Sequence, residues 1–189
     1  GIPIECYEYG NLDLSHLELQ NGLMSHQNYR NWCTLMEAEL AVLQDIGLEI
    51  DRSKFFGHSI YANNLRGIGG VNSFQLDALL NSNMTDDKSW SSSIDRAIGL
   101  HIYGNNNHVT LADSADISAT GNYSMGVRVD GSQNDLTIAA DNSIAVNGLE
   151  GNGIVVAYGK KHNVSIASGA SVTAMGDGGI GARFDFGSN

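Results

Sequence analysis

Side chains that could bind a polar ligand recur at one position of a repeated strand pattern. His101, Arg128 and Arg183 occupy this position in three copies of the pattern. Tyr103 and Asp130 follow two residues later, so an extended strand places them on the same face. Because solenoid faces bind extended partners such as polysaccharides, these residues indicate a binding stripe. An ordinary solvated sheet face explains the same residues and stays an open alternative.

Acidic residues in the same region could support two other kinds of chemistry. A pair of carboxylates can cleave a glycosidic bond, and the acids available for this are Asp113, Asp116, Asp130 and Asp185. They do not recur with Lys or Arg in a way that marks a cleft. Aspartate-rich loops can also bind calcium, but the Gly-Gly-x-Gly-x-Asp nonapeptide is absent. The sequence therefore singles out neither kind of site.

Two histidines, His16 and His26, flank Met24 near the N-terminus. A zinc hydrolase needs two histidines one helical turn apart and a glutamate that activates water, in the pattern His-Glu-x-x-His. This pattern does not occur in the chain. We therefore expect no catalytic residue and no cofactor in this chain, and we interpret the two histidines as one surface and one structural residue.

The composition narrows the class of protein and of partner. A net charge of −11 argues against nucleic acid and anionic membranes, because both require a basic face. Cys6 and Cys33 could pair or remain thiols, and a Cys-x-x-Cys zinc or redox motif does not occur. The chain begins at Gly1, shows no signal peptide and contains no apolar run near ~18 residues, so we expect a mature product or an excised piece.

These side chains are positioned by a repeated unit that starts with a glycine-led strand. The unit begins at Gly99, Gly126, Gly153 and Gly181, with spacings of 27, 27 and 28 residues. Two shorter alternating strands complete it, for example Val109–Leu111 and Ile117–Ala119. Glycine interrupts every helical window, and hairpins would not need a constant period. The sequence predicts a mainly-β fold, a parallel and right-handed β-solenoid with three strands per coil.

Equivalent residues of successive coils are expected to stack ~4.8 Å apart. The inward aliphatic side chains then form columns, such as Val109, Leu136 and Val164, and likewise Ile117, Ile144 and Val172. An extra residue in the third first-strand predicts a bulge there. Asn107 is expected to stack on Asn134, with His162 interrupting this amide ladder. The stack would leave an open edge at Asn189, which predicts further coils or end-to-end self-association.

The N-terminal part follows a different pattern. Thr34 and Glu37 form a capping-box pattern, so a helix is expected from there to about Ile46, with Met36, Leu40 and Leu43 on one face and Gly47 as its stop. We predict a helical cap over residues 1–54 and a β-helix over residues 55–189, truncated at its C-terminal end. Its first coil would be incomplete, with an insertion at about 65–95 that includes a short helix near Phe74–Leu80.

Two family resemblances rest on these motifs. Residues 98–189 resemble the passenger region of Gram-negative autotransporters, which form surface-exposed, adhesin-like β-helices. Residues 12–62 resemble the junction at which a zinc metalloprotease-like domain of large autotransporter-like proteins gives way to the β-helix. The motifs are Leu23-Met-Ser-His26, Met36-Glu-Ala-Glu-Leu40 and Phe55-Phe-Gly57-His-Ser-Ile-Tyr61. The resemblance implies that Met24 matches the methionine turn, and that His16 is a zinc ligand only if a His-Glu-x-x-His motif lies upstream.

The resemblance also implies a function for the chain. It would be a non-catalytic cell-surface or secreted module, serving as a stalk, adhesin or virulence-associated passenger at the bacterial outer membrane. Its partner would be a glycan or protein on a host or neighbouring cell, with membrane contact only through a C-terminal barrel outside this chain. Zinc would belong to the full-length protein. The alternatives are a polysaccharide lyase or hydrolase on the same scaffold and an inactive fragment of a secreted zinc metalloprotease.

Overall fold

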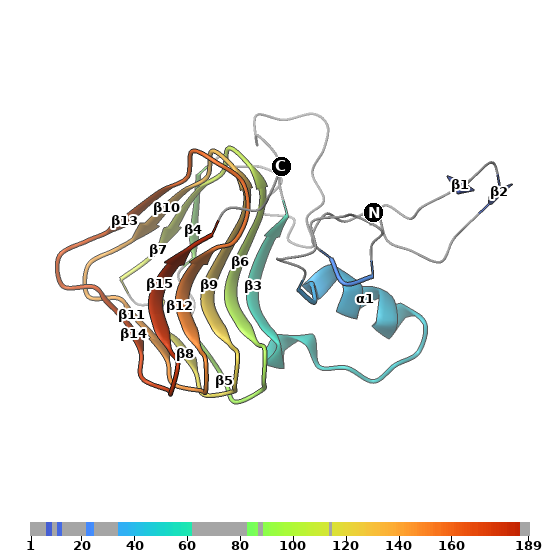
Figure 1. Cartoon of the computed structure of the whole chain (residues 1–189), viewed down its shortest axis with the longest axis horizontal. Coiled ribbons are helices and arrows are strands. Elements are labelled where there is room, and N and C mark those ends of the chain that lie inside the picture. Colours follow the sequence, from blue (N-terminus) through green and yellow to red (C-terminus); the bar gives the residue numbers. More distant parts are fainter. Residues whose placement is uncertain are drawn as a thin grey trace. The chain divides into compact units, whose positions relative to one another are not determined.

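The computed structural model describes residues 7–8, 11–12, 22–24, 34–61, 83–86, 89–113 and 115–185 (Figure 1). The chain divides into two units, Gly1–Arg52 with Gly187–Asn189, and Ser53–Phe186. Several predictions lie outside the described residues: the state of Cys6 and Cys33, the roles of His16 and His26, and the helix near Phe74–Leu80.

The second unit is a parallel β-solenoid with three sheets, as the repeat predicts (Figure 1). The first sheet contains β3 (Phe56–Tyr61), β6 (Ile98–Asn105), β9 (Met125–Ser132), β12 (Asn152–Val156) and β15 (Ile180–Phe184). The second contains β4 (Asn83–Asp86), β7 (His108–Leu111), β10 (Asp135–Ile138) and β13 (Asn163–Ile166). The third contains β5 (Trp90–Ser92), β8 (Ile117–Ala119), β11 (Ser143–Val146) and β14 (Ser171–Ala174). The predicted fold class is confirmed; handedness stays a prediction.

The pairing register reproduces the repeat length. Leu100 pairs with Val127 and Val127 with Ile154, at a separation of 27 residues, and Ile154 pairs with Ala182 at a separation of 28. The register also locates the extra residue. β12 pairs with β9 at a separation of 27 residues as far as Val156. The strands that follow β9 and β12 in the chain, β10 and β13, pair at a separation of 28. The additional residue therefore follows Val156, where β12 ends.

The first coil is more complete than the sequence indicates. β4 and β5 fall inside the predicted insertion of residues 65–95, yet they pair in parallel with β7 and β8. That prediction is wrong over these strands, so the first coil also has three strands. The reason lies in their sequences. β5 is Trp-Ser-Ser, with Trp90 where the later coils carry isoleucine or valine, and this single large residue packs partly buried against the core.

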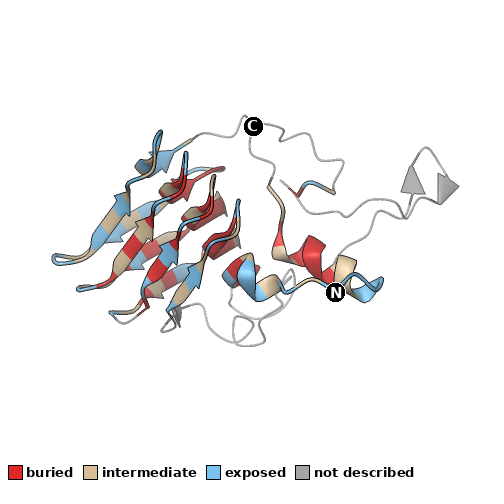
Figure 2. Ribbon diagram, turned by 90° about the horizontal axis from the view of Figure 1, so that it is seen from below, coloured by how far each residue is buried: buried red, intermediate tan, exposed pale blue. Residues whose placement is uncertain are grey.

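Aliphatic side chains fill the interior of the coils. Figure 2 shows buried residues recurring along the stacked strands. Val109 and Leu136 are buried in one column and Ile117 and Ile144 in another, which confirms the predicted stacking. Burial decreases in the last coil. Val164 and Val172 are only partly buried, while Ile166 is 48% and Phe184 57% exposed. The core is therefore best packed in the middle coils.

This gradient predicts unequal costs for one substitution made twice in one column. Ile138 is fully buried, whereas its register partner Ile166 is 48% exposed. We expect Ile138→Val to lower the free energy of unfolding by about 1 kcal/mol, because it removes one buried methylene group. Ile166→Val serves as the matched control and should cost less than half as much. Urea unfolding followed by circular dichroism measures both, and equal losses would contradict the gradient.

A side-chain ladder runs along one corner of the coils. The Asn107 backbone N–H donates to Asn134 Oδ1 at 3.0 Å, and the Asn134 side-chain amide donates to the carbonyl oxygens of Gly104 and Asp130 at 2.8 and 3.1 Å. His162 occupies the equivalent position one coil further on. The predicted interruption there is wrong, because His162 continues the ladder.

The histidine makes the same set of bonds as the asparagine. His162 Nδ1 accepts from the Asn134 backbone N–H at 3.3 Å. Its Nε2 lies 2.9 Å from the carbonyl oxygens of Gly131 and Tyr158, so Nε2 carries the hydrogen. We expect His162→Asn to preserve the free energy of unfolding and His162→Ala to lower it by about 1–2 kcal/mol, since polar backbone groups lose their partner. Thermal unfolding of both variants tests this, and equal losses would mean that the ladder does not stabilise the corner.

The N-terminal unit contains helix α1 (Glu37–Asp45), the strand pair β1 (Tyr7–Glu8) and β2 (Asn11–Leu12), and the start of a short 3-10 helix, Arg52–Lys54. α1 begins three residues later than predicted, after Met36. Its capping carboxylate is Glu39, which accepts from the Met36 backbone N–H at 2.8 Å, so the predicted Thr34–Glu37 box is wrong. Glu37 instead pairs with Arg52 at 2.9 Å.

Both ends of α1 have a clear physical basis. Glu39 is fully buried and also accepts from the Met24 backbone N–H at 2.5 Å. Burial raises its pKa, against the opposing effect of these backbone bonds. Gly47 ends the helix as predicted, with φ at +101° and with Leu48 donating back to the Leu43 carbonyl. In the described part of the chain, no helix has the length and apolar character to span a bilayer.

Candidate functional site

Six polar or aromatic residues form two rows across the outward face of the first sheet. In one row Ser59 on β3 pairs with His101 on β6, which pairs with Arg128 on β9. In the other row Tyr61, Tyr103 and Asp130 follow two residues later on the same strands. We call these six residues the polar cluster. The strands alternate, so this face is opposite the aliphatic interior.

Five of the six residues of the polar cluster are buried and Tyr103 is half-buried, although the cluster does not belong to the interior of the solenoid. Ser59, His101 and Asp130 are 0% exposed, and Tyr61 and Arg128 are nearly so. The interpretation as a solvated sheet face is therefore wrong for these buried residues, and the binding stripe stays a prediction. The alternation of a strand identifies which side chains share a face, but it does not reveal whether other parts of the chain cover that face.

A charged network lies at the centre of the polar cluster. Arg128 holds the Asp130 carboxylate with two bonds, Nε to Oδ2 at 2.7 Å and Nη2 to Oδ1 at 3.0 Å. His101 Nε2 lies 2.9 Å from Asp130 Oδ2. Burial alone would raise the pKa of Asp130, but the Arg128 charge and the bonds from His101 and Arg128 outweigh burial and lower it well below its usual range. Asp130 is therefore an ionised, buried carboxylate.

Two tyrosine rings hold the imidazole in place. The Tyr61 ring meets the His101 ring edge to face, with the centroids 5.6 Å apart. The Tyr103 ring approaches His101 from the same strand, with the centroids 6.1 Å apart. These contacts, together with the bond to Asp130, fix the plane of the imidazole. Fixed rings of this kind favour a single hydrogen-bonding arrangement.

Two buried atoms of the polar cluster have no hydrogen-bond partner among the described residues: Ser59 Oγ and His101 Nδ1. His101 Nε2 faces a carboxylate, which only accepts, so Nε2 carries the hydrogen. In the neutral ring, Nδ1 is then an acceptor, and Ser59 offers a donor on the neighbouring strand. Buried polar atoms are usually satisfied, and Asn142 Oδ1 and Asn152 Oδ1 are further exceptions, so such atoms are not confined to the polar cluster.

The structure brings together four of the five predicted binding residues. His101, Arg128, Tyr103 and Asp130 lie side by side, whereas Arg183 does not join them. It lies on β15, separated from Arg128 by the valine strand β12, and its side chain is 42% exposed. Arg183 forms an ion pair with Asp185 instead. This pair repeats the Arg-x-Asp arrangement of the polar cluster in a partly exposed setting.

Ser59 and Tyr61 were missed as members of the polar cluster, although the sequence contains a signal for them. The segment Gly57-His-Ser-Ile-Tyr61 aligns with Gly99-Leu-His-Ile-Tyr103. This alignment places Ser59 beside His101 and Tyr61 beside Tyr103, as the register shows. Only the comparison of neighbouring coils identifies these two residues, because neither stands out within its own strand.

The candidate acids for glycan cleavage do not converge. Asp113 and Asp116 are exposed on the connection between β7 and β8, Asp130 is buried on β9, and Asp185 follows β15. Asp116 accepts instead from the Ser143 backbone N–H at 2.8 Å. Within the described ranges, no group of three or more His, Cys, Asp or Glu residues could hold a metal ion. The role of Met24 as a methionine turn stays a prediction.

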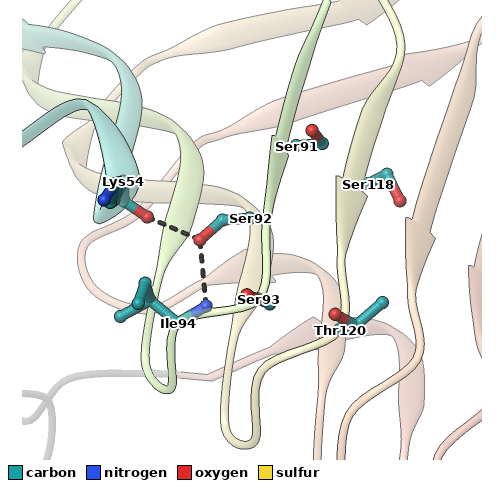
Figure 3. Close-up of a pocket in the computed structure, with 7 residues that line it drawn as sticks. All are labelled: Lys54, Ser91, Ser92, Ser93, Ile94, Ser118 and Thr120. Atoms are coloured by element: carbon teal, nitrogen blue, oxygen red, sulfur yellow. Dashed lines mark hydrogen bonds between the residues drawn. The ribbon is translucent and has the colours of Figure 1, made fainter.

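A shallow hollow of about 500 Å³ lies on the outer side of the third sheet (Figure 3). Its lining is Lys54, Ser91, Ser92, Ser93, Ile94, Ser118 and Thr120. Ser92 Oγ donates to the Lys54 carbonyl at 2.5 Å and accepts from the Ile94 N–H at 3.1 Å, so it supports the wall. The other hydroxyl groups of the lining belong to Ser91, Ser93, Ser118 and Thr120, and the lining carries no acidic side chain.

The parallel sheets, the constant register and the aliphatic columns define a β-solenoid protein. Comparisons with protein-family models, with curated proteins and with solved structures found no match for this chain.

Proposed function

We propose that the chain is a structural β-solenoid module of an exported protein, of the kind found in autotransporter passengers, and that it acts as a stalk or adhesin at the bacterial cell surface. The observation that carries this proposal is the uninterrupted ladder of parallel coils, each of which buries the aliphatic face of its neighbour. Such a stack produces a rigid, extended scaffold. The resemblance of residues 98–189 to passenger β-helices supports the same function.

The surface chemistry supports a glycan or protein partner rather than nucleic acid. A net charge of −11 disfavours binding to nucleic acid, because a polyanion requires a basic surface. The hollow on the third sheet is lined by hydroxyl groups and one lysine. Hydroxyl groups donate and accept hydrogen bonds, as saccharide recognition requires. A saccharide of a host or neighbouring cell is the partner that we propose for this face.

The location can be tested on the organism that produces the protein. An antiserum against the full chain should stain intact cells as strongly as permeabilised cells, and proteinase added outside should remove the signal. A cytoplasmic control protein should stain only after permeabilisation. Staining of the chain only in permeabilised cells would reject the surface location.

The partner is tested with the purified full chain on a glycan array and on cultured cells. We expect binding that falls at least about tenfold in Lys54→Glu, because a charge-assisted hydrogen bond is lost and a repulsive charge appears. Lys160→Glu changes an exposed lysine outside the hollow and makes the same charge change, so it should leave binding intact. Blank arrays and unbound cells would reject the adhesin role, and equal losses in both variants would reject the hollow as its site.

A further inference from the structure

We propose that the end of the coil stack formed by β13, β14 and β15 binds a second copy of this chain across a two-fold axis. The two copies meet end to end, and each strand of this end pairs antiparallel with a strand of the other copy. This inference goes beyond the structural function proposed above and does not depend on it, because it uses only the last layer of described strands.

The interior of the solenoid is open to solvent at this end. Ile166 on β13 is 48% exposed and Phe184 on β15 is 57% exposed. Their register partners one coil earlier, Ile138 and Val156, are only 0% and 4% exposed. The exposure therefore comes from the position at the end of the stack, because the same inward positions are dry where another coil covers them.

The backbone at this end is also available for pairing. Within the described part of the chain, β13, β14 and β15 are each the last strand of their sheet (Figure 1). An edge strand presents N–H and C=O groups to which another strand can bond. A partner that covers the whole end must supply three strands around a coil of the same cross-section, and a second copy has this arrangement.

The helical rise of the coil determines how two copies can meet. The chain rises ~4.8 Å per coil and passes three strands, so each strand lies about 1.6 Å above the one before it. β13 is therefore the lowest strand of the end, β14 is in the middle and β15 is the highest. A two-fold axis across the middle of β14 places β14 opposite itself and β13 opposite β15 of the second copy. The gap between the copies is then equal for all three pairs, whereas an axis across β13 or β15 leaves unequal gaps.

The side chains of the end fit this arrangement. β14 exposes Thr173 on its outward side, while Val172 packs partly buried against the core. With Thr173 on the axis, Val172 lies opposite Ala174 of the second copy, so inward residues meet inward residues. β13 and β15 bring Ile166 and Phe184 to the same interior from opposite copies. The association therefore buries the apolar side chains that a single copy leaves exposed.

The charges of the end are complementary under the same axis. Asp185 follows β15, and Lys161 precedes β13. Because β15 runs antiparallel to β13 of the second copy, the end of one strand meets the start of the other, and Asp185 approaches Lys161 of the second copy. The contact forms twice, as a two-fold interface requires. β14 meets itself on the axis, and its sequence Ser-Val-Thr-Ala carries no charge that could repel its own copy.

Sedimentation equilibrium of the full chain tests the association. We expect a species of twice the 20.1 kDa chain mass. Phe184→Glu should raise the dissociation constant at least about tenfold, because both copies lose an apolar contact and bury a charge. Leu149→Glu makes the same kind of change at a residue that is 40% exposed on the corner between β11 and β12, so it should leave the constant unchanged. Circular dichroism confirms that both variants fold.

Three results of this experiment would overturn the proposal. A chain that stays monomeric at the highest soluble concentration would mean that this end binds no second copy. A mass that keeps growing with concentration would indicate head-to-tail stacking, which has no two-fold axis. Equal weakening by Phe184→Glu and Leu149→Glu would place the contact elsewhere.

A single cysteine tests the position of the axis. In a chain with Cys6 and Cys33 changed to serine, Thr173→Cys should form a disulfide-linked dimer under mild oxidation. The reason is that opposite Cα atoms of antiparallel strands lie ~4.5–5.5 Å apart, within the range that a disulfide spans. Thr137→Cys is the matched control, exposed on β10 in the middle of the stack, and should remain monomeric. Absence of the Thr173→Cys dimer, or equal cross-linking of both variants, would overturn the two-fold axis across β14.

Discussion

Asp130→Ala is expected to lower the free energy of unfolding by about 3–5 kcal/mol, because it leaves a buried arginine charge without its partner. Arg128 is only 2% exposed and donates two bonds to this carboxylate, at 2.7 and 3.0 Å. His101 would lose its 2.9 Å contact as well. Urea unfolding monitored by circular dichroism measures the loss.

The chain contains a matched control for this substitution. Asp185 pairs with Arg183 in the same Arg-x-Asp spacing on the same sheet, but the Arg183 side chain is 42% exposed. Asp185→Ala should cost no more than about 1 kcal/mol, since water replaces the lost bonds of an exposed pair. If both substitutions cost the same, the burial of the Asp130 network does not stabilise the fold as we describe.

The effect of Asp130→Ala should also depend on pH. The pKa of Asp130 in the folded chain lies below its ordinary value of 3.8, so the folded state binds this proton less readily than the unfolded state. The ionised carboxylate therefore stabilises the fold above about pH 4, and this contribution is lost as the pH falls further. The difference between wild type and variant should stay constant near neutrality and shrink below about pH 4. A difference that grows in acid would contradict the assignment.

Gly131→Ala is expected to cost about 3 kcal/mol or more, or to prevent folding, because a backbone atom of the preceding coil occupies the space of the new methyl group. A Cβ at this position would lie 1.7 Å from the Gly104 carbonyl oxygen. The backbone there has φ at +105°, which an alanine adopts only with strain. Neither the strand nor the stacked carbonyl can move without breaking the register.

Gly169→Ala separates the steric collision from the backbone strain. Gly169 has a similar φ of +92°, but the nearest atom to its Cβ is the end of the Asp141 side chain, 2.9 Å away. That carboxylate can rotate aside, so we expect a loss of only about 1 kcal/mol, from the strain alone. Similar losses for both glycines in urea unfolding would show that close stacking of the coils at Gly131 does not limit the fold.

The repeated coils could be predicted from sequence because their signal is redundant. Each column, such as Val109, Leu136 and Val164, repeats the same alternation at a nearly constant spacing, so one irregular residue does not hide it. The first coil was harder to predict. Its third strand contains Trp90 and two serines instead of aliphatic residues, and its second strand is Asn-Met-Thr-Asp, so a pattern based on isoleucine and valine did not identify them.

The site was predicted only in part, for a different physical reason. Spacing showed that His101, Arg128 and Asp130 share a face, and the structure places them together. The sequence contains no local signal for the burial of that face, because burial depends on what other segments cover. His162 is a related case: its ring nitrogens reproduce the bonds of an asparagine amide, a geometric equivalence that residue type alone does not reveal.

The central claim is that equivalent residues of successive coils lie directly over one another, and a paired-cysteine experiment tests it most directly. Thr110 and Thr137 are register partners on the outward face of β7 and β10. Their Cα atoms should lie ~4.8 Å apart, within the range that a disulfide spans. In a chain with Cys6 and Cys33 changed to serine, Thr110→Cys with Thr137→Cys should form a disulfide under mild oxidation. Thr110→Cys with Ser165→Cys spans two strand spacings and should not, so cross-linking of the second pair but not the first would contradict the stacked coils.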